Sequence, residues 1–103
     1  MTRTKSMIYR PSTEANELYI FAVNNESVYI NTITPAIQNL RKKALKGVYD
    51  KEKAIDLFYH IATEASNKYN KYYGYSFNVQ DRFTCAVDFE ARFNEDIFEG
   101  IEA

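Results

Sequence analysis

Apolar residues recur at intervals of three and four along most of the chain, which is the spacing of one face of an α-helix. We predict helical segments over residues 13–24, from about 26 to 46, over 50–72 and from 78 to about 100. Short links between such segments favour packed neighbours. The pattern therefore predicts one all-α domain over residues 1–103, a small bundle of three to four helices, with residues 1–11 as an irregular or briefly extended arm.

The predicted core follows from the same spacing. Its main members are Ala15, Leu18, Tyr19, Ala22, Ile30, Ile33, Ile37, Leu40, Ala44, Ala54, Leu57, Phe58, Ile61, Ala65, Tyr69, Val79, Phe83, Ala86, Val87, Phe89, Phe93 and Ile97. Two alternatives stay open. Residues 18–23, which read LYIFAV, suit a strand as well as a helix. Pro35 either kinks one long helix or begins a shorter helix capped by Thr34, and the unbroken apolar stripe favours the kink.

The stretch from Asn39 to His60 carries the clearest boundary signals. The lysines that precede Gly47 suit the carbonyl end of a helix, and Gly47 can adopt the left-handed closing conformation. Asp50 is a good cap for the next helix. We therefore expect an αα-hairpin here, with the rest of the chain packed around it.

Composition limits the class of protein. Hydrophobic residues make up 46% of the chain and charged residues 26%, which indicates a folded domain. The single cysteine, Cys85, cannot form an internal disulfide, which suits a reducing cytoplasm. The sequence contains no apolar run long enough for a membrane span and no secretory signal pattern, so we expect a cytoplasmic protein that does not bind membranes.

Charge is divided along the chain although the formal net charge is −1. Residues 41–53 hold six cations against two acids, and residues 81–103 hold seven acids against two cations. This division predicts two electrostatic ends, each able to steer a partner of opposite sign.

Candidate catalytic groups are few. His60 is the only histidine and has no evident partner in the sequence, so a packed, hydrogen-bonded side chain is the simpler interpretation. Cys85 lies among apolar residues and is predicted to be an inert core thiol. The acidic residues follow no metal-loop spacing. We therefore expect no enzymatic activity, no metal and no cofactor.

Aromatic residues suggest binding instead, since nine Tyr and seven Phe bring the aromatic content to 16%. Exposed tyrosines are good anchors for a protein partner. The predicted partner-binding residues are Tyr73, Tyr75, Asp88, Glu95, Asp96 and Glu99. The alternative is direct binding to nucleic acid through Arg41, Lys42, Lys43 and Lys46, which we rank second because the sequence pI is about 5.8.

The segments NLRKKALKGVYDKEKAIDLF, ASNKYNKYY and SFNVQDRF resemble a family of short helical proteins encoded by tailed phages and mobile elements, over roughly residues 16 to 95. The resemblance implies a phage or mobile element in a bacterial host as the setting, and it supplies no activity that could be assigned to particular residues. In that setting we expect a monomer or homodimer that binds a host protein stoichiometrically, in the sharpest version as an inhibitor of a host defence system. A nucleic-acid-binding defence protein is one such partner, and the alternative is a nucleic-acid-binding accessory factor.

Overall fold

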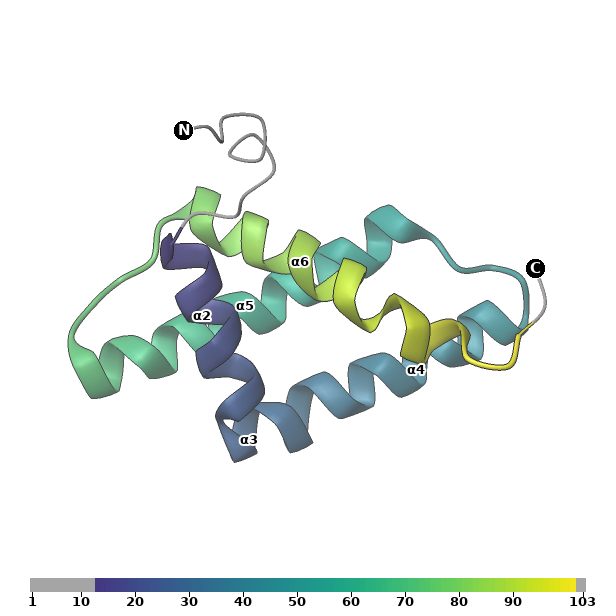
Figure 1. Ribbon diagram of the computed structural model, residues 1–103, viewed down its shortest axis with the longest axis horizontal. Helices are drawn as coiled ribbons and strands as arrows, with labels where there is room; N and C mark the ends of the chain where they lie inside the picture. The colour runs from purple at the N-terminus through teal and green to yellow at the C-terminus, as the bar shows by residue number, and fades with distance from the viewer. Residues whose placement is uncertain (1–12, 102–103) are drawn as a thin grey trace, which may run out of the picture.

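The computed structural model describes residues 13–101, and in that range all regular structure is helical (Figure 1). The elements are α2 (Thr13–Asn24), α3 (Glu26–Val28), the π-helical turn η1 (Tyr29–Ile33), α4 (Thr34–Leu45), α5 (Lys51–Tyr73) and α6 (Val79–Phe98). The all-α prediction is confirmed, and residues 18–23 are helix rather than strand. The predicted arm at residues 1–11 lies outside the described residues.

Local capping chemistry sets the helix starts. The side chain of Asn25 accepts from the amide of Val28, at 3.0 Å, and so begins α3. Asp50 accepts from the amides of Glu52 and Lys53 at the start of α5. Each of these short polar side chains satisfies amides that have no partner inside the helix. The predicted helix boundaries follow from this local chemistry and are close to those observed.

The helix remains continuous through Pro35, and the turn before it is widened. Ile33 and Thr34 both have right-handed helical dihedral angles, so Thr34 does not cap a new helix. The amide of Thr34 instead donates to Tyr29, one residue further back than in an α-helix. A wider turn gives the proline ring room where it would clash with the preceding carbonyl.

The π-helical turn shifts which side chains face the core. Val28 and Ile33 are both buried although they are five residues apart, and the next buried residue is Ala36. Ile30, which the regular spacing placed in the core, is 55% exposed. That prediction was wrong because the extra residue in η1 rotates Ile30 towards solvent.

Helix α6, rather than the α4–α5 pair, is the centre of the fold. It packs along α5 and also against α2 and α4 (Figure 1), whereas α4 and α5 have little direct contact. The predicted hairpin is correct in its connection and its short link, but it is not the unit that the rest of the chain packs around. Its two helices are held together through α6.

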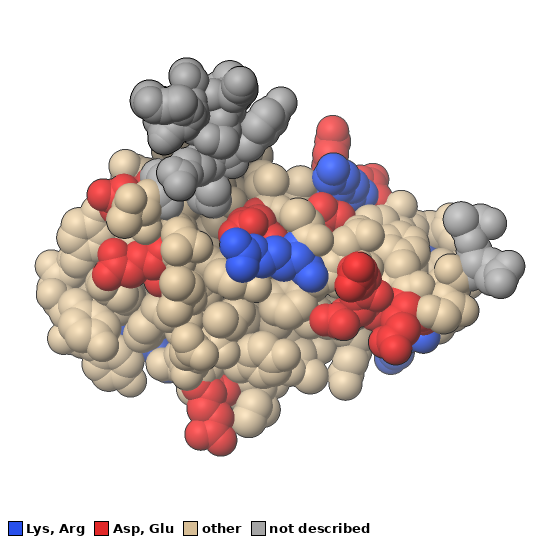
Figure 2. Space-filling view, viewed as in Figure 1, with Lys and Arg blue, Asp and Glu red and all other residues tan. Residues whose placement is uncertain are grey.

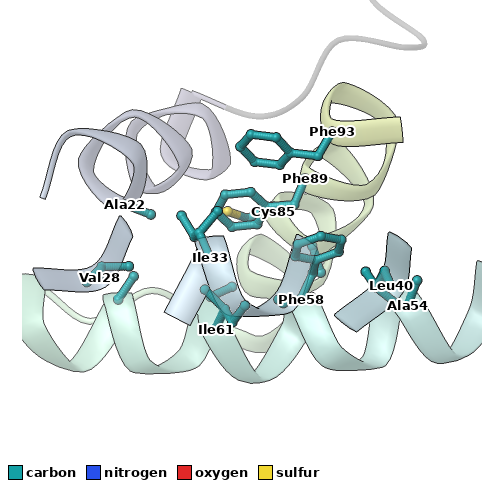
Figure 3. Close-up of a cluster of buried hydrophobic side chains, with 14 of the residues drawn as sticks. Ala22, Val28, Ile33, Leu40, Ala54, Phe58, Ile61, Cys85, Phe89 and Phe93 are labelled. Carbon is teal, nitrogen blue, oxygen red and sulfur yellow. The ribbon is translucent and has the colours of Figure 1, made fainter. Parts of the chain in front are cut away.

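Aromatic rings from α5 and α6 fill the middle of the core (Figure 3). The ring of Phe58 stacks on that of Phe89, with centroids 5.5 Å apart, and Phe89 stacks on Phe93 at 6.0 Å. Cys85 is fully buried next to them. Such stacked rings add to the free energy gained from burying apolar area.

The predicted inward face of α6 was partly wrong. Its buried residues form a stripe that repeats every four positions, Asp81, Cys85, Phe89, Phe93 and Ile97, and Ala86 and Glu90 beside this stripe are also buried. Residues two positions away from this stripe lie on the opposite side of a helix. Val79, Phe83 and Val87 are therefore exposed, at 62%, 48% and 38%.

Candidate protein-binding surface

The end of α5 and the loop that follows carry a group of aromatic rings, which we call the tyrosine cluster. It consists of Phe21, Tyr69, Tyr72, Tyr73, Tyr75 and Phe77. Gly74 ends α5 with a φ of 72°, a left-handed conformation that favours glycine, and its amide donates to Asn70. The turn directs the chain back over the end of α5 and brings Tyr75 and Phe77 beside Tyr69.

Tyr69 is the centre of the tyrosine cluster. Its ring lies 4.6 Å from that of Tyr73, 4.9 Å from that of Phe77 and 5.1 Å from that of Phe21 on α2. Its hydroxyl donates to a carboxylate oxygen of Glu17 on α2, at 2.7 Å, and this hydrogen bond raises the pKa of Tyr69. Tyr69 thus joins α2 to α5 and supports the rings around it.

Three tyrosines of the cluster are exposed to solvent. Tyr72 is 62% exposed, Tyr73 66% and Tyr75 44%, while Phe77, whose ring contacts those of Tyr75 and Tyr69, is buried. The edge-to-face contacts between neighbouring rings limit how far each side chain can rotate. The result is an exposed aromatic surface supported by a buried ring, with hydroxyl groups available for hydrogen bonds.

The opposite end of the molecule is charged, and its polar groups hold the fold together. The guanidinium of Arg41 on α4 donates to the carbonyls of Asp96 and Ile97, both at 3.4 Å. Basic residues 41–53 and the acidic end of α6 therefore lie next to each other. The prediction of two separate electrostatic ends was wrong, since the packing of α4 against α6 brings the basic residues and the acidic C-terminal half of α6 to the same end.

Tyr49 attaches the α4–α5 link to α6. Its hydroxyl donates to the buried carboxylate of Glu90, at 2.8 Å, and its ring packs edge-on against Phe98 at 4.9 Å. Glu90 accepts a second hydrogen bond from Asn94, at 3.2 Å. Burial and donation to Glu90 together raise the pKa of the Tyr49 hydroxyl well above its usual range. Tyr49 is a structural residue.

The predicted partner-binding residues do not form one surface. Tyr73 belongs to the tyrosine cluster, and so does Tyr75. The exposed acids Glu95, Asp96 and Glu99 lie at the far end of α6, and Figure 2 shows acidic side chains gathered over its C-terminal half.

Asp88 lies between the two ends and has a local role. It forms an ion pair with Arg92 at 3.1 Å, and the Arg92 guanidinium lies over the ring of Tyr19, 4.4 Å from its centroid. This half-buried carboxylate is therefore engaged within the fold.

The alternative nucleic-acid-binding residues are also divided. Lys42, Lys43 and Lys46 are exposed at the end of α4. The guanidinium of Arg41 donates to the backbone carbonyl of Asp96 on α6. It is therefore less available to a phosphate than the three exposed lysines are. The described structure does not gather these four cations into one groove.

The two candidate catalytic residues, His60 and Cys85, differ in burial. His60 is exposed rather than packed, which corrects the prediction. Cys85 is buried as predicted, and burial together with the nearby Asp88 raises the pKa of its thiol to about 12.

No group of three metal-ligating side chains comes together within residues 13–101. Within the same residues, no helix is both long and apolar enough to span a bilayer.

Neither Tyr72 nor Phe21 was placed in a binding surface from the sequence. The position of Tyr72 next to Tyr73, directly before the turn at Gly74, could have revealed the first. Only the packing of α2 on α5 reveals the second. No family model, curated protein or solved structure matches this chain, so the surface is interpreted from its geometry.

Proposed function

We propose that the protein acts by binding another protein stoichiometrically, with the tyrosine cluster as the contact surface. The observation that carries the proposal is the exposure of Tyr72, Tyr73 and Tyr75 on one supported aromatic surface. Exposed tyrosines supply large contact area at low conformational cost, and they are enriched among the residues that dominate binding energy.

The sharper form of the proposal is inhibition of a host defence system. Its support is the resemblance to short proteins of tailed phages and mobile elements, in which binding and blocking a host factor is a common mode of action. The tyrosine cluster would anchor such a partner. The acidic residues at the C-terminal half of α6 would then add charge steering from the other end rather than form part of the same contact.

Affinity capture from a bacterial lysate tests the proposal, with the Tyr72→Ser/Tyr73→Ser variant beside the unmodified chain. We expect the unmodified chain to recover one partner at a near-stoichiometric level and the variant to lose it. Lys42→Ala/Lys46→Ala is the matched control at the charged end, and it should retain the partner. For the sharper form, expression of the chain should restore phage plating on a strain that carries the defence system.

Equal capture by the chain and the tyrosine variant would contradict the proposed surface. Nucleic acid is a separate outcome of the same experiment. If DNA or RNA is captured, and binding weakens steeply with salt and is lost in the lysine variant, the accessory-factor alternative replaces the proposal.

A further inference from the structure

A groove runs between α4 and α5, where two consecutive helices joined by a short link would ordinarily pack together. It has two adjacent parts, of about 420 Å³ and 480 Å³, which share Asn39 and Leu57 as lining residues. The residues that line it come from η1, α4, α5 and the link between them. The groove is separate from the tyrosine cluster, so it is a second surface beyond the proposed function.

The groove has an apolar floor and the length of a short helix. Ala36, Leu40 and Ile61 are buried at its base, and Leu57 is half-buried. Along α5 the lining extends from Lys53 to Glu64, which at 1.5 Å per residue corresponds to about 16 Å, or three helical turns. An apolar floor of this length favours a ligand that carries a stripe of apolar side chains about three helical turns long.

We propose that this groove binds one amphipathic α-helix of a partner protein, with acidic side chains at the end of that helix that lies beside Lys43 and Lys53. A helix fits better than an extended peptide because the groove walls are helices. Their backbone groups are already hydrogen-bonded, and Pro35 has no N–H to offer. An extended peptide would leave its own backbone groups unpaired there, whereas a helix satisfies them internally.

The charges along the groove give the helix a defined polarity. Lys43 and Lys53 line the end near the α4–α5 link. Asp50 also lies there, but its carboxylate caps α5 by accepting from two amides. Glu64 lines the opposite end. An anionic end of the bound helix therefore matches the two lysines, and a cationic residue at its other end matches Glu64.

Two synthetic peptides test the proposal. The first is a 14-residue amphipathic helix, about the length of the groove with one turn to spare, with a Glu pair in its first turn and a Lys in its last. The second is identical except that a Lys pair replaces the Glu pair. We expect the first to bind about tenfold more tightly in fluorescence anisotropy. In Lys43→Glu/Lys53→Glu the preference should reverse.

His60 provides a direct report on the site because it is the only histidine and lines the groove. In a tag-free chain, its imidazole proton resonances should shift when the first peptide is added. Lys42→Glu/Lys46→Glu is the matched control, since it changes net charge equally at exposed residues outside the groove lining. It should retain the peptide preference, and so should Tyr72→Ser/Tyr73→Ser.

Several results would overturn the proposal. One is the absence of both an anisotropy change and a His60 shift at millimolar peptide. Another is an unchanged preference in Lys43→Glu/Lys53→Glu when circular dichroism shows that the variant is folded. A third is a dimer of the free chain, in sedimentation, that Asn39→Trp dissociates, since a second copy would then be the occupant. Asn39 is exposed and lines both parts of the groove, so tryptophan there should block it without disturbing the core.

Discussion

Tyr49 and Tyr73 lie at opposite ends of the molecule and serve opposite purposes. Tyr49 donates to the buried Glu90 and packs on Phe98, so it joins the α4–α5 link to α6. Tyr73 belongs to a surface that is supported from below but open to solvent, and it is 66% exposed. The charged end thus uses its polar groups to close the fold, while the aromatic end leaves its rings available. Charge and aromatic content in a sequence do not by themselves identify which group will bind a partner.

The largest effect at neutral pH is expected for Tyr49→Phe compared with Tyr73→Phe. The first removes the hydroxyl that donates to buried Glu90 and should lower the free energy of unfolding by about 2 kcal/mol. The second alters an exposed side chain and should change it by less than about 0.5 kcal/mol. Denaturant unfolding followed by circular dichroism measures both. Equal losses would mean that the two ends do not differ as described.

Alkaline pH should destabilise the fold through Cys85, which lies on α6 between the two ends. Burial raises the pKa of its thiol from 9.0 to about 12, so the folded thiol stays neutral while the unfolded thiol ionises. This contribution to stability is therefore complete below pH 9 and is lost as pH rises towards 12. The free energy of unfolding should fall by up to about 1.4 kcal/mol per pH unit in that window.

The variant Cys85→Ala isolates the thiol contribution to that pH dependence. Its slope between pH 9 and 11 should be shallower than that of the unmodified chain, whatever its stability at neutral pH. Unfolding curves at several alkaline pH values measure the difference. Identical slopes would show that the thiol does not stay neutral in the folded chain.

A smaller effect is expected at the charged surface itself. Arg41→Ala removes two hydrogen bonds to the carbonyls of α6 and should cost about 1 kcal/mol. Lys42→Ala, one residue away and exposed, should change stability by less than about 0.5 kcal/mol. Thermal unfolding of the pair tests whether Arg41 is structural. If both lose the same amount, the contact with α6 contributes nothing specific.

The smallest effect on stability is expected where the effect on binding should be greatest. Tyr72→Ser/Tyr73→Ser removes two exposed rings and should change the free energy of unfolding by less than about 0.5 kcal/mol per residue. This stability measurement is the control for the capture experiment. If the variant is folded and still loses the partner, it has lost a contact with the partner rather than its fold. A large loss of stability would show instead that the exposed rings support the fold.

The sequence predicted what depends on neighbours along the chain. Asp50 as a cap, Gly47 as a closing residue, and the boundaries of α2 and α5 rest on chemistry within a few residues. The burial of Cys85 was predicted in the same way, from its apolar neighbours in the sequence.

Features set by packing between helices were not predictable from the sequence. The central place of α6, the contact of Arg41 with its carbonyls and the addition of Phe21 to the tyrosine cluster all join residues far apart in the chain. The groove was missed for the same reason, since a short link predicts contact between α4 and α5. The groove stays open because α4 and α5 both pack on α6 rather than on each other.

The π-helical turn has a consequence for how the chain length can vary. Val28 and Ile33 are five residues apart, whereas the later buried positions Ala36, Leu40 and Ala44 follow at three and four. A chain lacking one residue of η1 would place the same two side chains four apart, which is the spacing of an ordinary α-helix. The turn therefore marks a point where the loss of a single residue would keep the core in register.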